Sequence, residues 1–423
     1  MSASKTSTEA LAALRAAVPP AARALGEAVR AQGGRAFLVG GEVRDTLLGR
    51  VGKDFDIEVF GLDVDTLETT LRRRGRVNAV GKSFGVLKWR PRGAPHEQDF
   101  DVSVPRRDSK VGPGHRGIAV QGDPTMTVEE AARRRDLTVN ALMYDLVADE
   151  LVDPWGGLAD LAAGVLRAVD RDTFLEDPLR ALRVVQFAAR LGFAVHPSLA
   201  ELCREAALDE LPAERVQGEW EKLLLKAPTP SLGFAVARDT QILERVFPEV
   251  AQVGSPEVTD RLVPARDELE GRGKRWALML CGWLHAAPLG DVEATLDRLW
   301  LHKVEGFATR EAVLATLGAL RRPLTSDADL RRAAVQAPLG LLLPLRQSLG
   351  DAVDSQQARA ATLDILWGAP ARLLLGRHLK QMGMRPGPAM GRLLAEVYER
   401  QLDGEVTNEE EARSVAASLL PDD

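Results

Sequence analysis

One predicted strand of this 423-residue chain carries two aspartates that should project from the same face. In residues 51–61, VGKDFDIEVFG, Asp54 and Asp56 interrupt an otherwise apolar run. Successive side chains of a β-strand point to opposite faces, so residues two apart share a face. Neighbouring carboxylates repel each other, and either water or a divalent cation between them relieves the repulsion. The pair therefore predicts either a solvent-facing strand or a metal site on a sheet.

A glycine turn precedes this strand. Residues 35–49, RAFLVGGEVRDTLLG, predict a short strand, a turn at Gly40 and Gly41, and a helix over 43–48. Glycine lets the backbone approach a ligand closely, and Arg44 lies near the start of the helix. These are the parts of a phosphate-binding turn. Their position about thirteen residues before the acidic strand favours the metal interpretation.

Further acids and arginines follow along the chain. EQDFDVSVPR places Asp99 and Asp101 on one face of a later strand, as candidates for a third metal-binding carboxylate. In residues 132–145, ARRRDLTVNALMYD, three arginines precede Asp136. They form either a solvated helix face capped by that aspartate or part of a binding site.

Residues 174–193, FLEDPLRALRVVQFAARLGF, form the strongest amphipathic helical pattern. Arg180 lies three or four residues after Glu176 and Asp177, so a helix would place the acids and the arginine on one face. They would form either an ordinary helix salt bridge or a hydrogen-bonding edge for a nucleobase. Both interpretations remain open from the residues alone.

The order of predicted elements indicates an α+β fold. Helices over 8–31 and 63–74 alternate with strands near 54–60, 77–80, 84–90 and 98–104, and from residue 158 the pattern is almost wholly helical. The predicted parts are a mixed-sheet head (1–157), a helical neck (158–228), a helical body (229–370) and a helical tail (371–423).

Taken together, these segments resemble the class II tRNA nucleotidyltransferases and the related bacterial poly(A) polymerases. The head domain of that family belongs to the DNA polymerase beta-like nucleotidyltransferase superfamily. The resemblance covers residues 35 to about 250, and a looser one covers 375–415. The matching segments are FLVGGEVRDTLLG, KDFDIEVFG, RRRDLTVNALMYD, LVDPWGGLADL, FLEDPLRALRVVQFAARLGF and PAERVQGEWEKLLL.

The resemblance implies roles for individual residues. Asp54 and Asp56 would bind the catalytic Mg²⁺ ions, with Asp101 as the third carboxylate. The implied nucleotide contacts are Gly40, Gly41 and Arg44 at the triphosphate, Arg135, the base-reading pair Asp177 and Arg180, and Arg183. Gln186 departs from one branch of the family, which has arginine there, and is not included.

The implied reaction is template-independent addition of C and A, from CTP and ATP, to the 3′ end of tRNA. The shared motifs do not separate this activity from a poly(A) polymerase or from an enzyme that adds only CC or only A. A catalytically dead RNA-binding protein is the alternative outside enzymes. The formal net charge of −6 requires any RNA-binding surface to be local.

Several other features suggest structural roles. No run is long enough for a membrane helix and no signal peptide is evident, so we expect a cytoplasmic protein. Cys203 and Cys281 are expected to be buried free thiols. We expect four tryptophans in helical patterns, Trp276, Trp283, Trp300 and Trp367, to be core residues. The arginine run at 72–76 is expected to be a solvated helix end, whereas KVGPGHRG (110–117) suits a loop near the active site.

His285 marks a second departure from longer family members. Those relatives carry a phosphohydrolase module with an adjacent His-Asp pair, but here Ala286 follows His285. The sequence predicts a helical domain that has lost the metal and the hydrolase activity. The alternative is that His285 is an ordinary helix-end histidine.

Overall fold

The structure is a computed structural model that describes residues 7–50, 52, 55–78, 86–93, 99–110, 118–253 and 256–420. Asp54 and most of segment 110–117 lie outside the described residues. The chain separates into two compact units, one comprising residues up to Pro212 together with Ala235–Val246 and the other comprising Ala213–Phe234 together with residues from Phe247 onward. The division into head, neck, body and tail stays a prediction.

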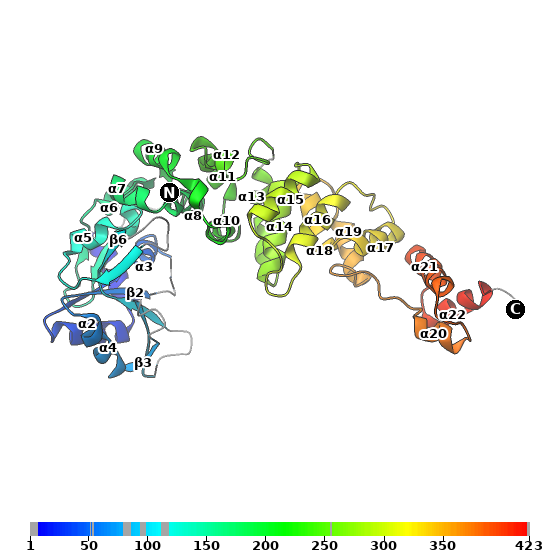
Figure 1. The fold of residues 1–423 in the computed structure, drawn as a ribbon, viewed down its shortest axis with the longest axis horizontal. Coiled ribbons are helices and arrows are strands. Elements are labelled where there is room, and N and C mark those ends of the chain that lie inside the picture. Colours follow the sequence, from blue (N-terminus) through cyan, green and yellow to red (C-terminus); the bar gives the residue numbers. More distant parts are fainter. Residues whose placement is uncertain are drawn as a thin grey trace. The chain divides into compact units, whose positions relative to one another are not determined.

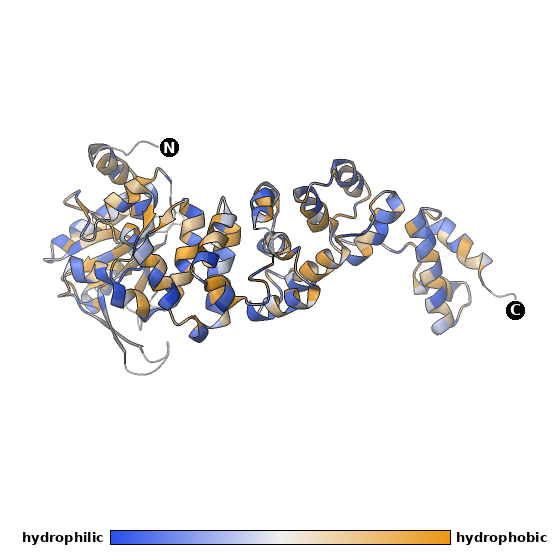
Figure 2. Ribbon diagram, turned by 90° about the horizontal axis from the view of Figure 1, so that it is seen from above, coloured by the Kyte–Doolittle hydropathy of each residue, from blue (hydrophilic) through white to orange (hydrophobic). Residues whose placement is uncertain are grey.

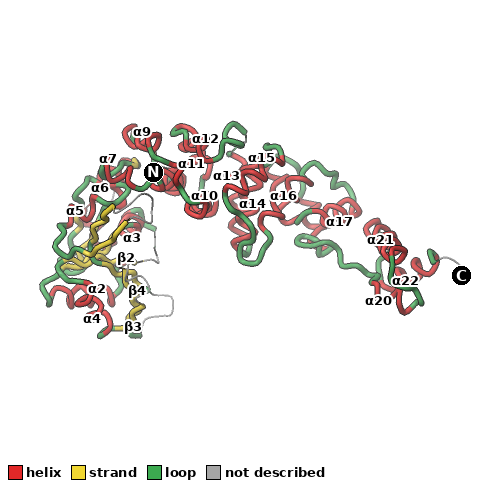
Figure 3. Tube along the Cα trace, viewed as in Figure 1, coloured by secondary structure: helices red, strands yellow, loops and turns green. Residues whose placement is uncertain are grey.

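A mixed sheet forms the centre of the first unit (Figures 1 and 3). In the described residues its strand order is β3-β4-β5-β2-β1-β8-β9. β2 and β5 are parallel, and the other neighbouring pairs are antiparallel. The strands are β1 (Arg35–Val39), β2 (Phe55–Phe60), β3 (Gly75–Asn78), β4 (Val86–Pro91), β5 (Phe100–Ser103), β8 (Met143–Asp145) and β9 (Leu151–Val152). Two smaller pairs are β6 (Arg106–Lys110) with β7 (Ile118–Gly122), and β10 (Val165–Leu166) with β11 (Ala194–Val195).

Helices cover this sheet and follow it. They are α1 (Ser7–Ala17), α2 (Pro20–Arg30), α3 (Gly41–Leu47), α4 (Val64–Arg72), α5 (Val128–Arg133), the 3₁₀ turn η3 (Thr138–Asn140), α6 (Gly157–Ala163), α7 (Arg171–Glu176), α8 (Leu179–Leu191), α9 (Pro197–Glu205), η4 (Leu208–Glu210) and α12 (Ile242–Val246). The prediction of a single helix over 8–31 was wrong, because α1 ends at Ala17 and α2 begins at Pro20. Proline cannot donate the backbone hydrogen bond of a helix interior, but it is tolerated in the first turn of α2.

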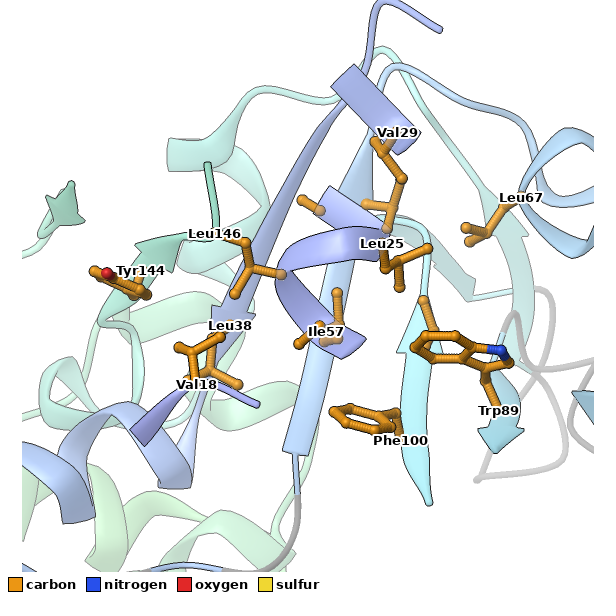
Figure 4. Close-up of a cluster of buried hydrophobic side chains, with 14 of the residues drawn as sticks. Val18, Leu25, Val29, Leu38, Ile57, Leu67, Trp89, Phe100, Tyr144 and Leu146 are labelled. Atoms are coloured by element: carbon orange, nitrogen blue, oxygen red, sulfur yellow. The ribbon is translucent and has the colours of Figure 1, made fainter. Parts of the chain in front are cut away.

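The two faces of the sheet bury different sets of residues. On one face, side chains of α2 and α4, including Leu25 and Leu67, pack with Ile57, Trp89 and Phe100 (Figure 4). On the other face, side chains of β1 and β8 pack with residues of and around α5. Because strand residues alternate, Asp56 projects from the face opposite to α2 and α4. The core therefore fixes which side of the sheet carries the acids.

The second unit consists of helices (Figure 3), and hydrophilic and hydrophobic residues mix along them (Figure 2), as expected for amphipathic helices. They are α10 (Ala213–Lys226), α13 (Glu257–Glu268), α14 (Arg272–Leu284), α15 (Leu289–Arg298), α16 (Thr309–Ala319), α17 (Asp327–Gln336), α18 (Leu339–Ser348), α19 (Asp354–Thr362), α20 (Gly376–Gln381), α21 (Pro388–Asp403) and α22 (Glu409–Ser418); α11 (Pro230–Asp239) contributes residues to both units. Among the described residues no helix has the length and hydropathy of a membrane span.

Burial confirms part of the sequence interpretation. Cys203 and Cys281 are both fully buried free thiols, and Trp276 and Trp283 are core residues. The same expectation was wrong for Trp300 and Trp367, which are exposed. Helical spacing alone did not distinguish them, because Trp300 lies beyond the end of α15 and Trp367 lies after α19.

Candidate active site

Two acidic strands meet at a pocket on the face of the sheet opposite to α2 and α4. Asp56 of β2 and Asp101 of β5 are direct neighbours in the parallel register. Both line a pocket of about 310 Å³, together with Glu58 and Arg135. Lys88 of β4 pairs with Asp101 on its other side, with Nζ and Oδ1 3.7 Å apart. Two of the three predicted metal-binding carboxylates therefore lie side by side.

The remaining acids near this pocket have different surroundings. Asp54 precedes β2 and lies outside the described residues. Asp99 accepts two hydrogen bonds from Arg90, at 2.5 and 2.8 Å, so its carboxylate is held by that guanidinium. Within the described part of the chain no group of three or more His, Cys, Asp or Glu side chains is arranged to hold a metal.

The glycine turn reaches the same pocket. Gly40 has φ +74°, in the region that favours glycine. A Cβ atom there would lie 3.1 Å from Nη1 of Arg135 and 3.8 Å from Oδ2 of Asp56. Arg135 donates from Nη2 to Glu58 at 3.3 Å, and its buried Nε has no hydrogen-bond partner among the described residues. Turn, acid and arginine thus converge, and any side chain at Gly40 would crowd them.

A buried hydrogen-bond chain connects α3 to α8. Arg44 Nη1 donates to Oδ1 of Asn140, Asn140 Nδ2 donates to Oδ1 of Asp136 at 2.9 Å, and Arg183 Nε donates to Oδ2 of Asp136 at 2.6 Å. The exposed fractions of Arg44, Asn140 and Asp136 are 3%, 5% and 7%. The four side chains are referred to below as the Arg44–Arg183 relay.

Charge balance in the relay depends on Asp136. Burial alone would raise the pKa of Asp136, but the nearby Arg183 and the hydrogen bond from Asn140 outweigh it and hold that pKa below its ordinary value. Asp136 is therefore ionised and balances the charge of Arg183, whereas Arg44, at the other end of the relay, pairs with Asp45 at 2.8 Å. The predicted alternative, an aspartate that simply caps a helix, does not describe these contacts.

One aromatic ring lies between three arginines. The guanidinium carbons of Arg44, Arg183 and Arg190 lie 5.0, 5.2 and 5.6 Å from the ring centre of Phe187. Phe187 is 5% exposed, so these cation–π contacts are largely desolvated. The ring provides a second connection between the two ends of the relay.

Asp177 and Arg180, which were expected to share a helix and read the base, do not lie in one helix. Asp177 ends α7 in an extended conformation, and its carboxylate accepts from the backbone N–H of Leu179 at 3.2 Å. Arg180, in α8, donates to the carbonyls of Thr173 and Arg134 at 2.6 and 2.7 Å. Burial lowers the pKa of Arg180. The helical-spacing argument for this pair was wrong, because Pro178 ends one helix and begins the next.

The structure brings some of the predicted site residues together. Asp56, Asp101 and Arg135 line one pocket, Gly40 lies against Arg135 and Asp56, and a Cβ atom on Gly41 would lie 3.5 Å from Nη2 of Arg44. Asp177, Arg180 and Arg183 do not line this pocket. No sequence pattern gave a site role to Glu58, Asn140 or Phe187, and for Asp136 the sequence left open a helix cap or part of a binding site. Period-two spacing from Asp56 could have identified Glu58. No local pattern identifies Asn140, because its partners are distant in sequence.

His285 has ordinary surroundings. It follows α14, and its Nδ1 lies 2.9 Å from the carbonyl oxygen of Gly282, three residues earlier. This contact agrees with a plain helix-end histidine. Descent of this region from a hydrolase module stays a prediction.

Comparison with known families identifies the sheet-containing region. Residues 36–167 match the poly A polymerase head domain. Residues 192–253 match a second family, described as the probable RNA and SrmB-binding site of polymerase A. The family resemblance expected from the sequence is therefore confirmed.

The curated relatives that match this chain are named Multifunctional CCA protein. The protein from Nitrosomonas eutropha is 41% identical over 228 residues, which is 52% of each chain. The protein from Methylococcus capsulatus is 42% identical over 226 residues, or 52% of this chain and 50% of the relative. The chain thus spans about half the length of the curated relatives it matches.

Solved structures support the fold over nearly the whole chain. The CCA-adding enzyme of Bacillus stearothermophilus, solved with CTP, superposes with a TM-score of 0.71 and 24% identity, covering 95% of this chain and 98% of that one. The Thermotoga maritima CCA-adding enzyme, solved with tRNA, gives a TM-score of 0.66 and 21% identity, covering 98% and 99%. The predicted fold, a mixed-sheet head followed by helices, is confirmed.

Proposed function

We propose that this chain is a nucleotidyltransferase that adds C and A, from CTP and ATP, to the 3′ end of tRNA. The observation that carries the proposal is a pocket lined by Asp56, Asp101 and Arg135, with Gly40 against it, in a region that matches the poly A polymerase head domain. The names of the matching relatives and solved structures support the tRNA substrate. A cytoplasmic location stays part of the proposal.

Asp56 and Asp101 fit a magnesium site. Both are neighbouring carboxylates on rigid strands, and Mg²⁺ prefers such hard oxygen ligands. We assign Asp54 as a further ligand from its place in the sequence. Bound Mg²⁺ would supply activation of the RNA 3′-hydroxyl and stabilisation of the pyrophosphate leaving group.

Arginines on several elements would position the nucleotide. The turn at Gly40 and Gly41 lets the triphosphate approach the backbone closely. Arg135 lines the pocket, with its buried Nε available to an acceptor, and the rigidly held Arg44 provides a fixed positive charge.

Asp177 and Arg180 would select the base, and Arg183 would be a further nucleotide contact. They lie at the α7–α8 junction and in α8, where backbone and relay contacts hold them. A site built from fixed donors and acceptors rejects a base that leaves those groups unpaired. Protein side chains would thus select C or A without a template strand.

A primer-extension assay with Mg²⁺ tests the proposal. The protein receives tRNAs that end before CCA, after C or after CC, together with CTP, ATP or both, beside an unstructured RNA. We expect stepwise completion of CCA. Asp54→Ala, Asp56→Ala and Asp101→Ala should abolish incorporation, whereas Asp99→Ala is the matched control, because Asp99 is held by Arg90. Normal turnover by Asp56→Ala would refute the metal assignment.

A poly(A) polymerase is the second candidate, since the matching head family carries that name. Long A tracts on the unstructured RNA would favour it over CCA addition. Addition of only CC or only A would identify a partial tRNA enzyme. RNA binding without incorporation in any reaction would favour a catalytically dead RNA-binding protein.

A further inference from the structure

A second pocket, of about 260 Å³, lies on the head away from the reaction centre. Arg73 and Arg74, which follow α4, line it together with Trp89 of β4, Arg92, and small side chains of α2. The backbone N–H of Arg92 donates to the carbonyl of Arg74 at 2.8 Å. That hydrogen bond holds arginines from two separate segments side by side.

This pocket and the reaction centre lie on opposite faces of the sheet. Residues of β4 alternate, so Lys88 pairs with Asp101 on the acidic face while Trp89 packs into the core under α2 and α4. Trp89 and Phe100 lie together in that cluster (Figure 4), with ring centres 5.4 Å apart. A ligand in the second pocket would therefore not occupy the nucleotide site.

The charges around the pocket are uncompensated within the described residues. Arg73, Arg74 and Arg92 are exposed and form no salt bridge with any acid the structure describes. Arg72, from the same run, pairs with Glu68 at 2.6 Å and does not line the pocket. The arginines that follow α4 can be explained as a solvated helix end. Arg92 cannot be explained in this way, because it follows strand β4.

Trp89, a residue of the apolar core, also lines the pocket. Trp89 is 1% exposed, and its Nε1 has no hydrogen-bond partner among the described residues. The indoles of Trp220 and Trp276 are also unpaired, but both belong to the core of the second unit. Trp89 differs because it lines a pocket together with three arginines. Its Nε1 is buried, so the arginines supply the donors of the pocket and the indole is a nearby reporter group.

We propose that Arg73, Arg74 and Arg92 form a binding site for a phosphate group beside Trp89. Guanidinium groups match phosphate oxygens in charge and geometry. The volume is below the range of drug-sized pockets, which suits a phosphate headgroup rather than a large molecule. The phosphate belongs either to a small phosphorylated molecule or to the RNA backbone, and the two sources are separable by experiment.

NMR with ¹⁵N-tryptophan-labelled protein tests the small-molecule source. The chain has seven tryptophans, and Trp89→Phe identifies the Trp89 indole resonance by its loss. Inorganic phosphate or pyrophosphate, titrated without Mg²⁺, should shift that resonance. Arg73→Gln and Arg92→Gln should each weaken the titration about two- to fivefold. Arg72→Gln, the matched control, should leave it unchanged.

Salt dependence of tRNA binding tests the RNA source. Each lost phosphate contact should reduce the slope of log affinity against log salt by about 0.7 to 0.9. A lower slope for Arg73→Gln and Arg92→Gln but not for Arg72→Gln, without any phosphate-induced indole shift, would assign the site to the RNA backbone. An unchanged slope and no indole shift would overturn the proposal, whether or not the protein transfers nucleotides.

Discussion

Replacing Asn140 by leucine is the sharpest test of the site geometry. Asn140 is 5% exposed, accepts from Arg44 and donates to Asp136 at 2.9 Å. Leucine has a similar size but makes neither hydrogen bond, so a buried cation and a buried carboxylate each lose a partner. Hydrogen bonds to charged groups contribute about 1.5–3 kcal/mol each. We therefore expect Asn140→Leu to lower the unfolding free energy by about 3 kcal/mol.

Function should change together with stability. Arg44 loses one of the two side-chain acceptors that hold its guanidinium and keeps the other, Asp45, at 2.8 Å, so the KM for CTP should rise about tenfold, equivalent to about 1.4 kcal/mol. Urea unfolding and single-nucleotide incorporation measure the two effects. Thr138→Val is the matched control, because Thr138 lies in the same 3₁₀ turn but donates to Asp160 at 2.7 Å. It should lower stability while leaving the KM for CTP unchanged.

A double-mutant cycle measures whether the contacts at the two ends of the relay depend on each other. Arg44→Met and Arg183→Met should show a coupling energy above about 0.5 kcal/mol in the native background. Because both arginines also contact Phe187, part of that coupling should survive in the Asn140→Leu background. Strictly additive effects of Arg44→Met and Arg183→Met, or wild-type stability of Asn140→Leu, would refute the reasoning.

Three further predictions follow from burial and backbone geometry. The pKa of Asp136 is depressed in the folded protein, so its ionisation stabilises the fold at any pH above its ordinary pKa of 3.8. That stabilisation is lost as the pH falls below 3.8 towards the pKa of the folded state. Urea unfolding between pH 3 and 6 should therefore show a smaller pH dependence for Asp136→Asn than for the native protein. Burial raises the pKa of the Cys203 thiol to about 12 and also raises that of Cys281, so a thiol reagent at pH 8 should modify neither until the protein unfolds; rapid labelling of the native protein would contradict this. Gly40→Ala should destabilise the protein by about 1 kcal/mol from its positive φ and lower kcat/KM, because the added Cβ would lie 3.1 Å from Arg135; denaturation and incorporation assays measure both effects.

Several features of the sheet-containing region were predictable from short stretches of sequence. Strand periodicity predicted that Asp54 and Asp56 share one face of a strand and that Asp99 and Asp101 share one face of another, and the Gly40–Gly41 turn joins β1 to α3 as expected. These features depend on residues close in sequence. The register of β2 and β5 then placed Asp56 beside Asp101. Local rules failed where proline changed the outcome, at Pro20 and Pro178, although both prolines were visible in the sequence.

The sequence by itself determined the alternation of the acidic strands, the glycine turn and the amphipathic helices, because backbone periods of 2 and 3.6 act over a few residues. Only the tertiary structure decided that Arg44 reaches Arg183 through Asn140 and Asp136, since those partners meet only when α3, η3 and α8 pack together. It likewise placed Arg92 beside Arg74. Contacts between distant segments depend on the register and packing of the whole head, which no local pattern encodes.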